Sequence, residues 1–218
     1  AMIEILQKSP LFAGMDPGEI QHILQCLGNR QKRYRKNEYI FMEGEQKPRV
    51  GVILSGSVQA VKETKSGGLI LINQMFPGDT FGLSYVCADV KYLPISIISA
   101  ENTDILFIEL DQLVRTCHNA CQFHVEMIKN ALRILAEKNL FLDNKLYYIS
   151  HKTIRDRIQS YLEDQESRHN SNEFEISFNR EQLADFLCVD RSALSRELSH
   201  MKKEGIIDYK RNWFRATF

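Results

Sequence analysis

The segment from Phe178 to Gly205 constrains the fold most strongly, because it predicts two short helices separated by a tight turn. Asn179 can cap the first helix, and Gln182 three residues later completes a capping box. Asp190 can cap the second helix, in which apolar residues recur at helical spacing until Gly205 ends it. The pattern is typical of a helix-turn-helix.

The second helix of this segment is polar on the side opposite its apolar stripe. Arginine pairs bidentately with guanine in the major groove, and serine reaches bases or phosphates, so this face suits a helix that reads DNA. The alternative is the solvated face of an ordinary helical hairpin. The candidate DNA-binding residues of the segment are Asn179, Arg191, Ser192, Ser195, Arg196 and Ser199.

A predicted hairpin follows the two helices. Residues 205–209 and 213–218 resemble strands, with a turn at Lys210, Arg211 and Asn212, and residues 173–178 alternate as a half-buried strand does. A helix-turn-helix followed by such a hairpin is a winged helix. Lys210 and Arg211 would then lie near a phosphate or the minor groove, although basic turns are often only solvated.

Composition sets the limits for the rest of the chain. Its 218 residues suffice for two compact domains, and a formal net charge of zero means that DNA affinity must come from local geometry and avidity. The five cysteines include no CxxC pair, which argues against a zinc finger or a disulfide framework. No secretory signal or long apolar run is present, so we expect a soluble cytoplasmic protein without membrane contact.

The amino-terminal half predicts an all-β sandwich or barrel. A short helix opens at residues 16–19 with a capping box, and short strands with glycine-containing turns between them follow. The best predicted strands are residues 39–41, 51–54, 58–61, 69–73, 96–98 and 105–108. With the winged helix, the fold class is α+β.

A long uninterrupted helix is predicted between the two halves, opened by a capping box at Asn119 and Gln122. Apolar residues alternate at spacings of four and three, which is a heptad pattern, and the single Asn139 within it would favour a two-stranded register. We therefore predict a parallel homodimer, the alternative being a helix that packs on its own domain. The predicted dimerisation residues are Cys121, Val125, Ile128, Leu132, Leu135, Asn139, Leu142 and Leu146.

This helix should end near residues 147–148, where Ser150 can cap a helix over residues 153–162 and the junction can act as a hinge. The predicted domains are an effector β-roll over residues 1–110, a linker and dimerisation helix over 111–149, and a DNA-binding domain over 150–218.

In this chain order the protein resembles the Crp/Fnr family of bacterial transcription regulators. The most specific segments are residues 54–61, similar to the family's glycine turn between roll strands, residues 76–82, similar to the turn before its effector pocket, and residues 187–196, similar to the start of its recognition helix. The resemblance implies a double-stranded β-helix (a cupin-like jelly roll) followed by a dimer helix and a winged helix. It places Arg191, Ser192, Ser195 and Arg196 at base- and phosphate-contacting positions. The implied function is effector-responsive regulation by a homodimer on a pseudo-palindromic duplex, with RNA polymerase as a further partner.

The effector site departs from the family pattern. Where relatives that bind cyclic nucleotides carry a glutamate for the ribose and an Arg-Ser pair for the phosphate, this chain has Leu83 and Leu93-Pro94. A buried phosphate without a cationic partner loses its charge-assisted hydrogen bonds, so cyclic AMP is not expected as the effector. The pocket either takes an unidentified small organic molecule or is filled by its own side chains. Its predicted residues are Gly82, Leu83, Ser84, Tyr85, Leu93, Pro94 and Ile95.

Other sensing chemistries have less support. An iron–sulfur centre would need an amino-terminal cysteine cluster, and only Cys26 lies there. A metal- or thiol-sensing alternative uses the group Cys117, His118, Cys121 and His124, although such clusters also arise by chance. We assign no metal ligand and leave the cofactor unknown.

Two further classes of function are alternatives. A cupin-like enzyme would need histidine and carboxylate ligands on the roll, and the predicted strands contain no histidine, so we expect no enzymatic activity. A nucleotide-binding module acting on a protein partner would show no salt-dependent DNA binding.

Overall fold

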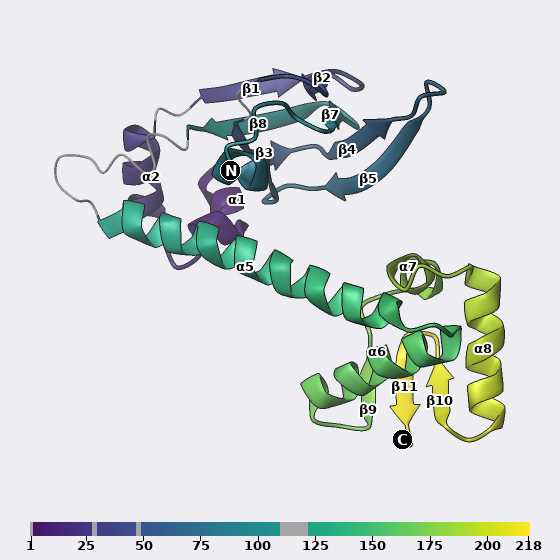
Figure 1. The fold of residues 1–218 in the computed structure, drawn as a ribbon. Coiled ribbons are helices and arrows are strands. Elements are labelled where there is room, and N and C mark those ends of the chain that lie inside the picture. The colour runs from purple at the N-terminus through teal and green to yellow at the C-terminus, as the bar shows by residue number, and fades with distance from the viewer. Residues whose placement is uncertain (1, 28–29, 47–48, 110–121) are drawn as a thin grey trace. The chain divides into compact units, whose positions relative to one another are not determined.

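The computed structural model describes residues 2–27, 30–46, 49–109 and 122–218. They form two compact units, Ala1–Ala136 and Glu137–Phe218 (Figure 1). The helices of the first unit are α1 (Met2–Lys8), the 3₁₀ helix η1 (Pro10–Phe12), α2 (Pro17–Cys26) and α3 (Leu83–Cys87). Its strands are β1 (Arg30–Tyr34), β2 (Tyr39–Phe41), β3 (Val50–Ser55), β4 (Val58–Glu63), β5 (Leu69–Met75), β6 (Thr80–Phe81), β7 (Ser96–Ser99) and β8 (Thr103–Ile108).

The strands of the first unit form two antiparallel four-stranded sheets, with the orders β1-β8-β3-β6 and β2-β7-β4-β5. Aromatic side chains from both sheets meet in the core of the roll, among them Phe41, Phe81 and Phe107. The predicted α+β class and the β-roll are confirmed. Strand β1 carries four exposed residues and one buried one, so the alternation that would have revealed it in the sequence is absent.

A second core of the first unit lies between its helices and sheet. Side chains of α1 and α2 pack against β3 and β8, and Met127 and Ala131 of helix α5 (Gln122–Ser150) complete this cluster. The Asn130 side chain is buried in the same place, where its Nδ2 donates to the carbonyl of Leu11 at 3.1 Å and to that of Ala13 at 2.9 Å. The first half of α5 is therefore an integral part of the unit.

The second unit contains the end of α5 and the winged helix. Its remaining elements are α6 (Ile154–His169), β9 (Glu173–Glu175), α7 (Arg180–Phe186), α8 (Arg191–Lys203), β10 (Ile207–Lys210) and β11 (Trp213–Ala216). The three strands form an antiparallel sheet in the order β10-β11-β9. Side chains from α6, α7, α8 and this sheet share one apolar core.

The junction between α5 and α6 differs from its prediction. Helix α5 continues to Ser150, two residues beyond the expected end, and the Ser150 hydroxyl donates back to the Tyr147 carbonyl at 2.7 Å. Thr153 caps α6 instead, accepting from the Asp156 amide at 3.1 Å, and α6 continues to His169. A serine can bond within its own helix as well as cap the next one, so its position alone did not identify the cap.

No helix within the described parts of the chain has the length and apolar character that crossing a bilayer requires.

Glycine is required at the β3–β4 turn for two separable reasons. Gly56 has a φ of +79°, and a Cβ built there would lie 2.4 Å from the Asn102 carbonyl oxygen. Gly67, in the β4–β5 turn, has a φ of +81° with nothing within 4 Å of such a Cβ. The two positions therefore share the backbone strain and differ in steric crowding.

We predict that Gly67→Ala destabilises the protein by about 1 kcal/mol, the cost of a left-handed alanine. Gly56→Ala should cost roughly 1–3 kcal/mol more, because backbone must also move. Urea unfolding followed by far-ultraviolet circular dichroism measures both. Equal losses for the two variants would show that the close approach to Asn102 has no energetic consequence.

Candidate nucleic-acid interface

Two side-chain caps fix the helices of the helix-turn-helix. Asn179 Oδ1 accepts from the Gln182 amide at 2.9 Å, and Gln182 Oε1 accepts from the Asn179 amide at 2.9 Å. Asp190 accepts from the amides of Ser192 at 2.9 Å and Ala193 at 3.0 Å. Each cap satisfies amides that the first turn of a helix leaves without a partner. The predicted boundaries of both helices are confirmed at their amino-terminal ends.

The two sides of α8 have opposite roles. Leu194, Leu198 and Met201 are fully buried in the core of the unit. Arg191 and Arg196 are exposed on the other side, and neither has a hydrogen bond or ion pair to any residue that the structure describes. Both guanidinium groups therefore keep their donors available for an external acceptor such as a base edge or a phosphate.

The serine hydroxyls of α8 differ in whether they already donate a hydrogen bond within the protein. The Ser192 hydroxyl donates to Asp190, and the Ser199 hydroxyl donates to the Ser195 carbonyl at 2.9 Å. Hydrogen bonds from the Ser192 hydroxyl and the Ala193 amide hold the pKa of Asp190 below its usual range, because they favour the charged carboxylate. Ser192 and Ser199 are exposed and Ser195 is half-buried, and Asn179 uses only its oxygen in the cap, which leaves its amide nitrogen available.

The hairpin places two basic side chains at its tip. Lys210 and Arg211 are both exposed, and Arg211 has a φ of +55° in the turn between β10 and β11. Arg180 of α7 donates to the Arg211 carbonyl at 3.2 Å, and its guanidinium lies 5.1 Å from the ring centroid of Tyr209. Burial lowers the pKa of Arg180, since its charged form has lost water. Arg180 therefore fixes the hairpin to the helix-turn-helix.

Two arginines of α6 hold the same elements together, and sequence reasoning missed both. Arg157 donates to the carbonyls of His151 at 2.9 Å, Leu187 at 3.2 Å and Cys188 at 3.2 Å, which fastens the turn between α7 and α8. Arg155 Nε lies 2.6 Å from Glu197, and its terminal nitrogens bond Glu204 at 2.7 and 2.8 Å. Most of these partners lie 30 to 49 residues away, so no local sequence pattern could identify them.

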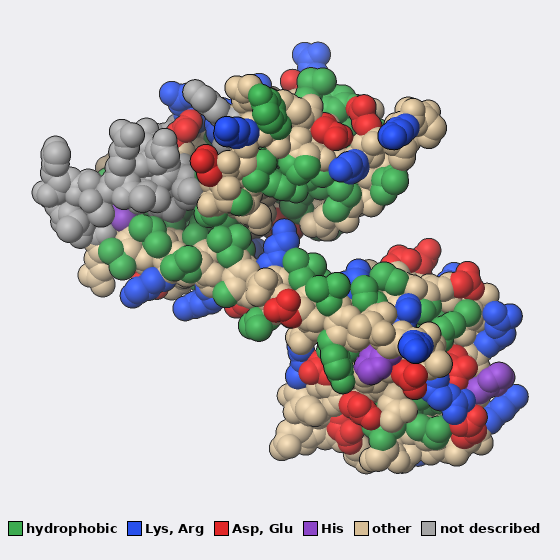
Figure 2. All heavy atoms as spheres, viewed as in Figure 1, with side chains coloured by type: hydrophobic (Ala, Val, Ile, Leu, Met, Phe, Trp, Pro, Cys, Tyr) green, Lys and Arg blue, Asp and Glu red, His purple; other side chains and the backbone are tan. Residues whose placement is uncertain are grey.

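The charge of the second unit is mixed. In the space-filling view, lysine and arginine side chains alternate with aspartate and glutamate side chains across the visible face of this unit (Figure 2). No broad basic face is visible from this side.

The predicted effector-pocket residues lie at the start of α3 and before β7. Leu83, Leu93 and Ile95 are buried, Ser84, Tyr85 and Gly82 are partly buried, and Pro94 is exposed. Leu93 and Ile95 belong to the core between the two sheets, and Tyr85 packs against it. A Cβ at Gly82 would lie 2.2 Å from the Arg49 carbonyl oxygen, so this glycine allows α3 to start close to β3.

The predicted dimerisation residues occupy one side of α5. Ile128 and Leu135 are partly buried against the core of the first unit. The described side chains exposed to solvent include Val125 (45%), Leu132 (62%), Leu142 (46%) and Leu146 (61%), together with Asn139. Cys121 lies outside the described residues.

Three of the four residues of the candidate metal or thiol cluster lie outside the described part of the chain, namely Cys117, His118 and Cys121. His124 is buried on α5. Where the chain is described, no three histidine, cysteine, aspartate or glutamate side chains are grouped to hold a metal ion.

Comparison with known proteins adds evidence to this geometry. Residues 31–120 match the family model of the cyclic nucleotide-binding domain, and residues 156–216 match that of the Crp-like helix-turn-helix domain. The chain belongs to the Crp/Fnr family. Together the two models match more than half of the sequence, and both lie in the order that the sequence predicts.

Individual Crp/Fnr relatives are distant. The transcriptional activator protein anr of Pseudomonas aeruginosa is 20% identical over 189 residues, covering 84% of this chain and 75% of that protein. The electron transport regulator A of Shewanella oneidensis is 22% identical over 197 residues, which cover 86% of this chain and 74% of that protein. The catabolite activator protein of Thermus thermophilus has a similar fold, with a TM-score of 0.56 and 21% identity, covering 96% of this chain and 94% of that one.

We predict that Arg157→Lys lowers the free energy of unfolding by roughly 1–3 kcal/mol, because an ammonium cannot satisfy three separated carbonyls. Trp213, the only tryptophan of the chain, allows fluorescence to follow the second unit during urea unfolding. The matched control is Arg168→Lys, since Arg168 makes one exposed ion pair with Asp164. That variant should stay within about 0.5 kcal/mol of the parent. A loss for Arg157→Lys no greater than for Arg168→Lys would contradict the role given to Arg157.

Proposed function

We propose that this Crp/Fnr-family regulator binds a pseudo-palindromic duplex as a homodimer and reads it with α8. The observation that carries the proposal is the pair of exposed guanidinium groups of Arg191 and Arg196 on a capped helix. Arginine in this position can donate two hydrogen bonds to the O6 and N7 atoms of guanine. Ser195 adds a hydroxyl donor on the same face, the Ser199 hydroxyl can accept because its proton goes to the Ser195 carbonyl, and Lys210 and Arg211 add phosphate contacts from the hairpin.

Dimerisation through α5 is the second element of the proposal. Four large apolar side chains, Val125, Leu132, Leu142 and Leu146, are exposed on the predicted heptad face. Covering them with a second copy would remove apolar surface from water, and Asn139 would pair with its counterpart to fix the register. A two-fold axis along α5 would give two recognition helices, which matches an operator with two half-sites.

Control by an effector other than cyclic AMP is the third element. The family model over residues 31–120 is named for cyclic nucleotides, yet this chain carries Leu83 and Leu93-Pro94 where the ribose and phosphate contacts would be. Leucine side chains have no hydrogen-bonding group, and Leu83 and Leu93 are both buried in the first unit. We assign sensing to residues 1–110, pairing to 111–149 and DNA binding to 150–218. An effector must bind two arrangements of these parts unequally in order to switch them.

We predict that Arg196→Ala weakens specific operator binding by roughly 1–3 kcal/mol, because it removes a base or phosphate contact. Electrophoretic mobility shift with the operator found by genomic footprinting measures this loss. Lys65→Ala removes one exposed positive charge from the β4–β5 turn and serves as the control for net charge. Affinity for the operator that is unchanged in Arg196→Ala would refute the assignment of this face.

We further predict that Leu132→Asp produces monomers at micromolar concentration, since a carboxylate in an apolar seam opposes pairing. Leu140→Asp is a matched control, because Leu132 and Leu140 are both 62% exposed and Leu140 lies outside the heptad core. Sedimentation velocity distinguishes the two species. Dimers of both variants, or monomers of the parent protein, would refute the seam.

A further inference from the structure

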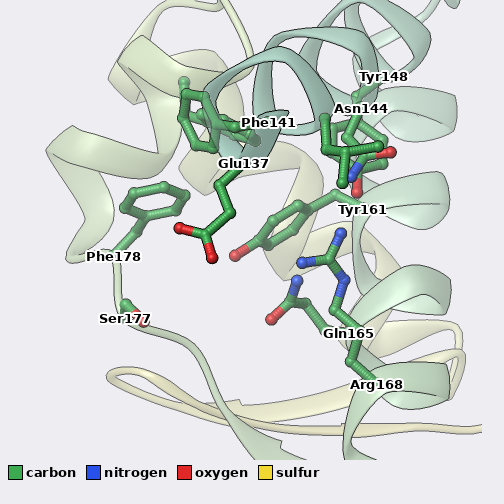
Figure 3. Close-up of a pocket in the computed structure, with 11 residues that line it drawn as sticks. Glu137, Phe141, Asn144, Tyr148, Tyr161, Gln165, Arg168, Ser177 and Phe178 are labelled. Atoms are coloured by element: carbon green, nitrogen blue, oxygen red, sulfur yellow. The ribbon is translucent and has the colours of Figure 1, made fainter. Parts of the chain in front are cut away.

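The second unit contains a cavity that the proposed function does not use. Its volume is about 440 Å³, within the range of small-molecule sites. It is lined by residues from the second half of α5, from α6, and from α7 with the segment that precedes it (Figure 3). Every lining residue belongs to the second unit, so the cavity is complete within that unit.

Aromatic rings form the walls of this cavity. Phe186 lies at the centre of the ring cluster, with its centroid 4.8 Å from that of Phe178, 5.4 Å from Phe141 and 5.7 Å from Tyr161. Phe141 is nevertheless 50% exposed. A large apolar ring at the mouth of an aromatic cavity is stabilised when a flat molecule covers it.

One largely buried tyrosine of the cavity wall has a hydroxyl without a partner in the described chain. Tyr161 is only 4% exposed, and its hydroxyl has no hydrogen bond to any described residue. Figure 3 shows this hydroxyl directed into the same space as the Glu137 carboxylate, beside the Phe178 ring. Tyr148, the other tyrosine of the cavity, already donates to Asp164 at 2.6 Å. The Tyr161 hydroxyl is therefore a position where a ligand in the cavity would gain a hydrogen bond.

The two charged side chains that line the cavity, Arg168 and Glu137, differ in whether they already have a partner. Arg168 Nε lies 2.7 Å from Asp164, which compensates its charge. Glu137 has no ion pair or hydrogen bond within the described chain, and its carboxylate can only accept. A carboxylate and a phenol oxygen that point into one aromatic cavity both suit the same ligand group, a protonated amine.

Dimerisation through α5 would leave this cavity open. Leu132 and Asn139 are assigned to position a of the heptad. Glu137 and Asn144 then fall at position f, Leu140 at b and Phe141 at c, all of which are outer positions. The outer positions of a two-stranded coiled coil face solvent. The seam and the cavity thus use different sides of the same helix.

We propose that this cavity binds a small aromatic amine, whose ring packs among Phe141, Phe178 and Phe186 while its amine donates to Glu137 and to the Tyr161 oxygen. The site differs from the β-roll position where the family places its effector, and it requires neither DNA nor a dimer. It is a second ligand site, located where α5, α6 and α7 meet.

Tryptamine is the probe, and indole-3-propionate is the matched control because it carries the same ring with a carboxylate in place of the amine. Isothermal titration calorimetry of the full chain should give a Kd of roughly 0.1–1 mM for tryptamine, as expected for a fragment of this size. Indole-3-propionate should bind at least about five-fold more weakly, because its charge repels Glu137. Nitrogen-15 chemical shifts around Tyr161 and Phe186 should move on titration with tryptamine.

Two conservative variants test the contacts. Tyr161→Phe keeps the ring and removes the hydroxyl, and Glu137→Gln keeps the shape and removes the charge. Each should weaken tryptamine binding by roughly two- to five-fold while circular dichroism and the unfolding midpoint show that the fold is intact. Three results would overturn the proposal. They are no detectable binding of tryptamine at concentrations up to about 5 mM, equal affinity for both probes, or unchanged affinity for tryptamine in both variants.

Discussion

The burial of one amide side chain determines which face of α5 is available to a partner. Asn130 donates to two backbone carbonyls around η1, and losing both bonds would leave a buried polar group unsatisfied at a cost of roughly 1–3 kcal/mol. Rotation of α5 about its axis is opposed by this cost and by the burial of Met127 and Ala131. Leu132 is consequently held toward solvent. Helix α5 can therefore pack on its own unit with one face and still pair with another chain through a different face.

Local patterns in the sequence were sufficient for most of the architecture. The two caps at Asn179 and Asp190 act within three residues of themselves, so their geometry could be derived without knowledge of the fold. Most strands of the first unit were predicted because short apolar runs lie between glycine-containing turns, although β3 and β7 are buried along most of their length and do not alternate. Strand β1 was missed because its exposed side chains carry no periodic signal, and the cap of α6 was misplaced because two nearby residues can both serve.

The tertiary contacts of the DNA-binding unit could not be predicted in this way. The partners of Arg155 and Arg157 lie in other helices, and nothing in the spacing of these arginines distinguishes them from solvated residues. The aromatic cavity could not be predicted for the same reason, because Phe141 lies on α5, Tyr161 on α6 and Phe178 in the segment before α7. Each of these residues follows a reasonable helical or strand pattern, and only folding brings them together. Sequence patterns predicted a surface that would meet DNA, whereas the contacts that support this surface became visible only in the structure.

The division of α5 into sides has a consequence for how such a chain can change over time. In the proposed arrangement, substitutions at Leu132 or Leu146 would act on pairing between chains, whereas substitutions at Glu137 or Phe141 would act on ligand binding in the aromatic cavity. Because the two sets of side chains lie on different sides of the helix, a substitution in one set need not remove the contacts of the other. Ligand specificity and dimer pairing could thus change independently during evolution, although both depend on residues of the same helix.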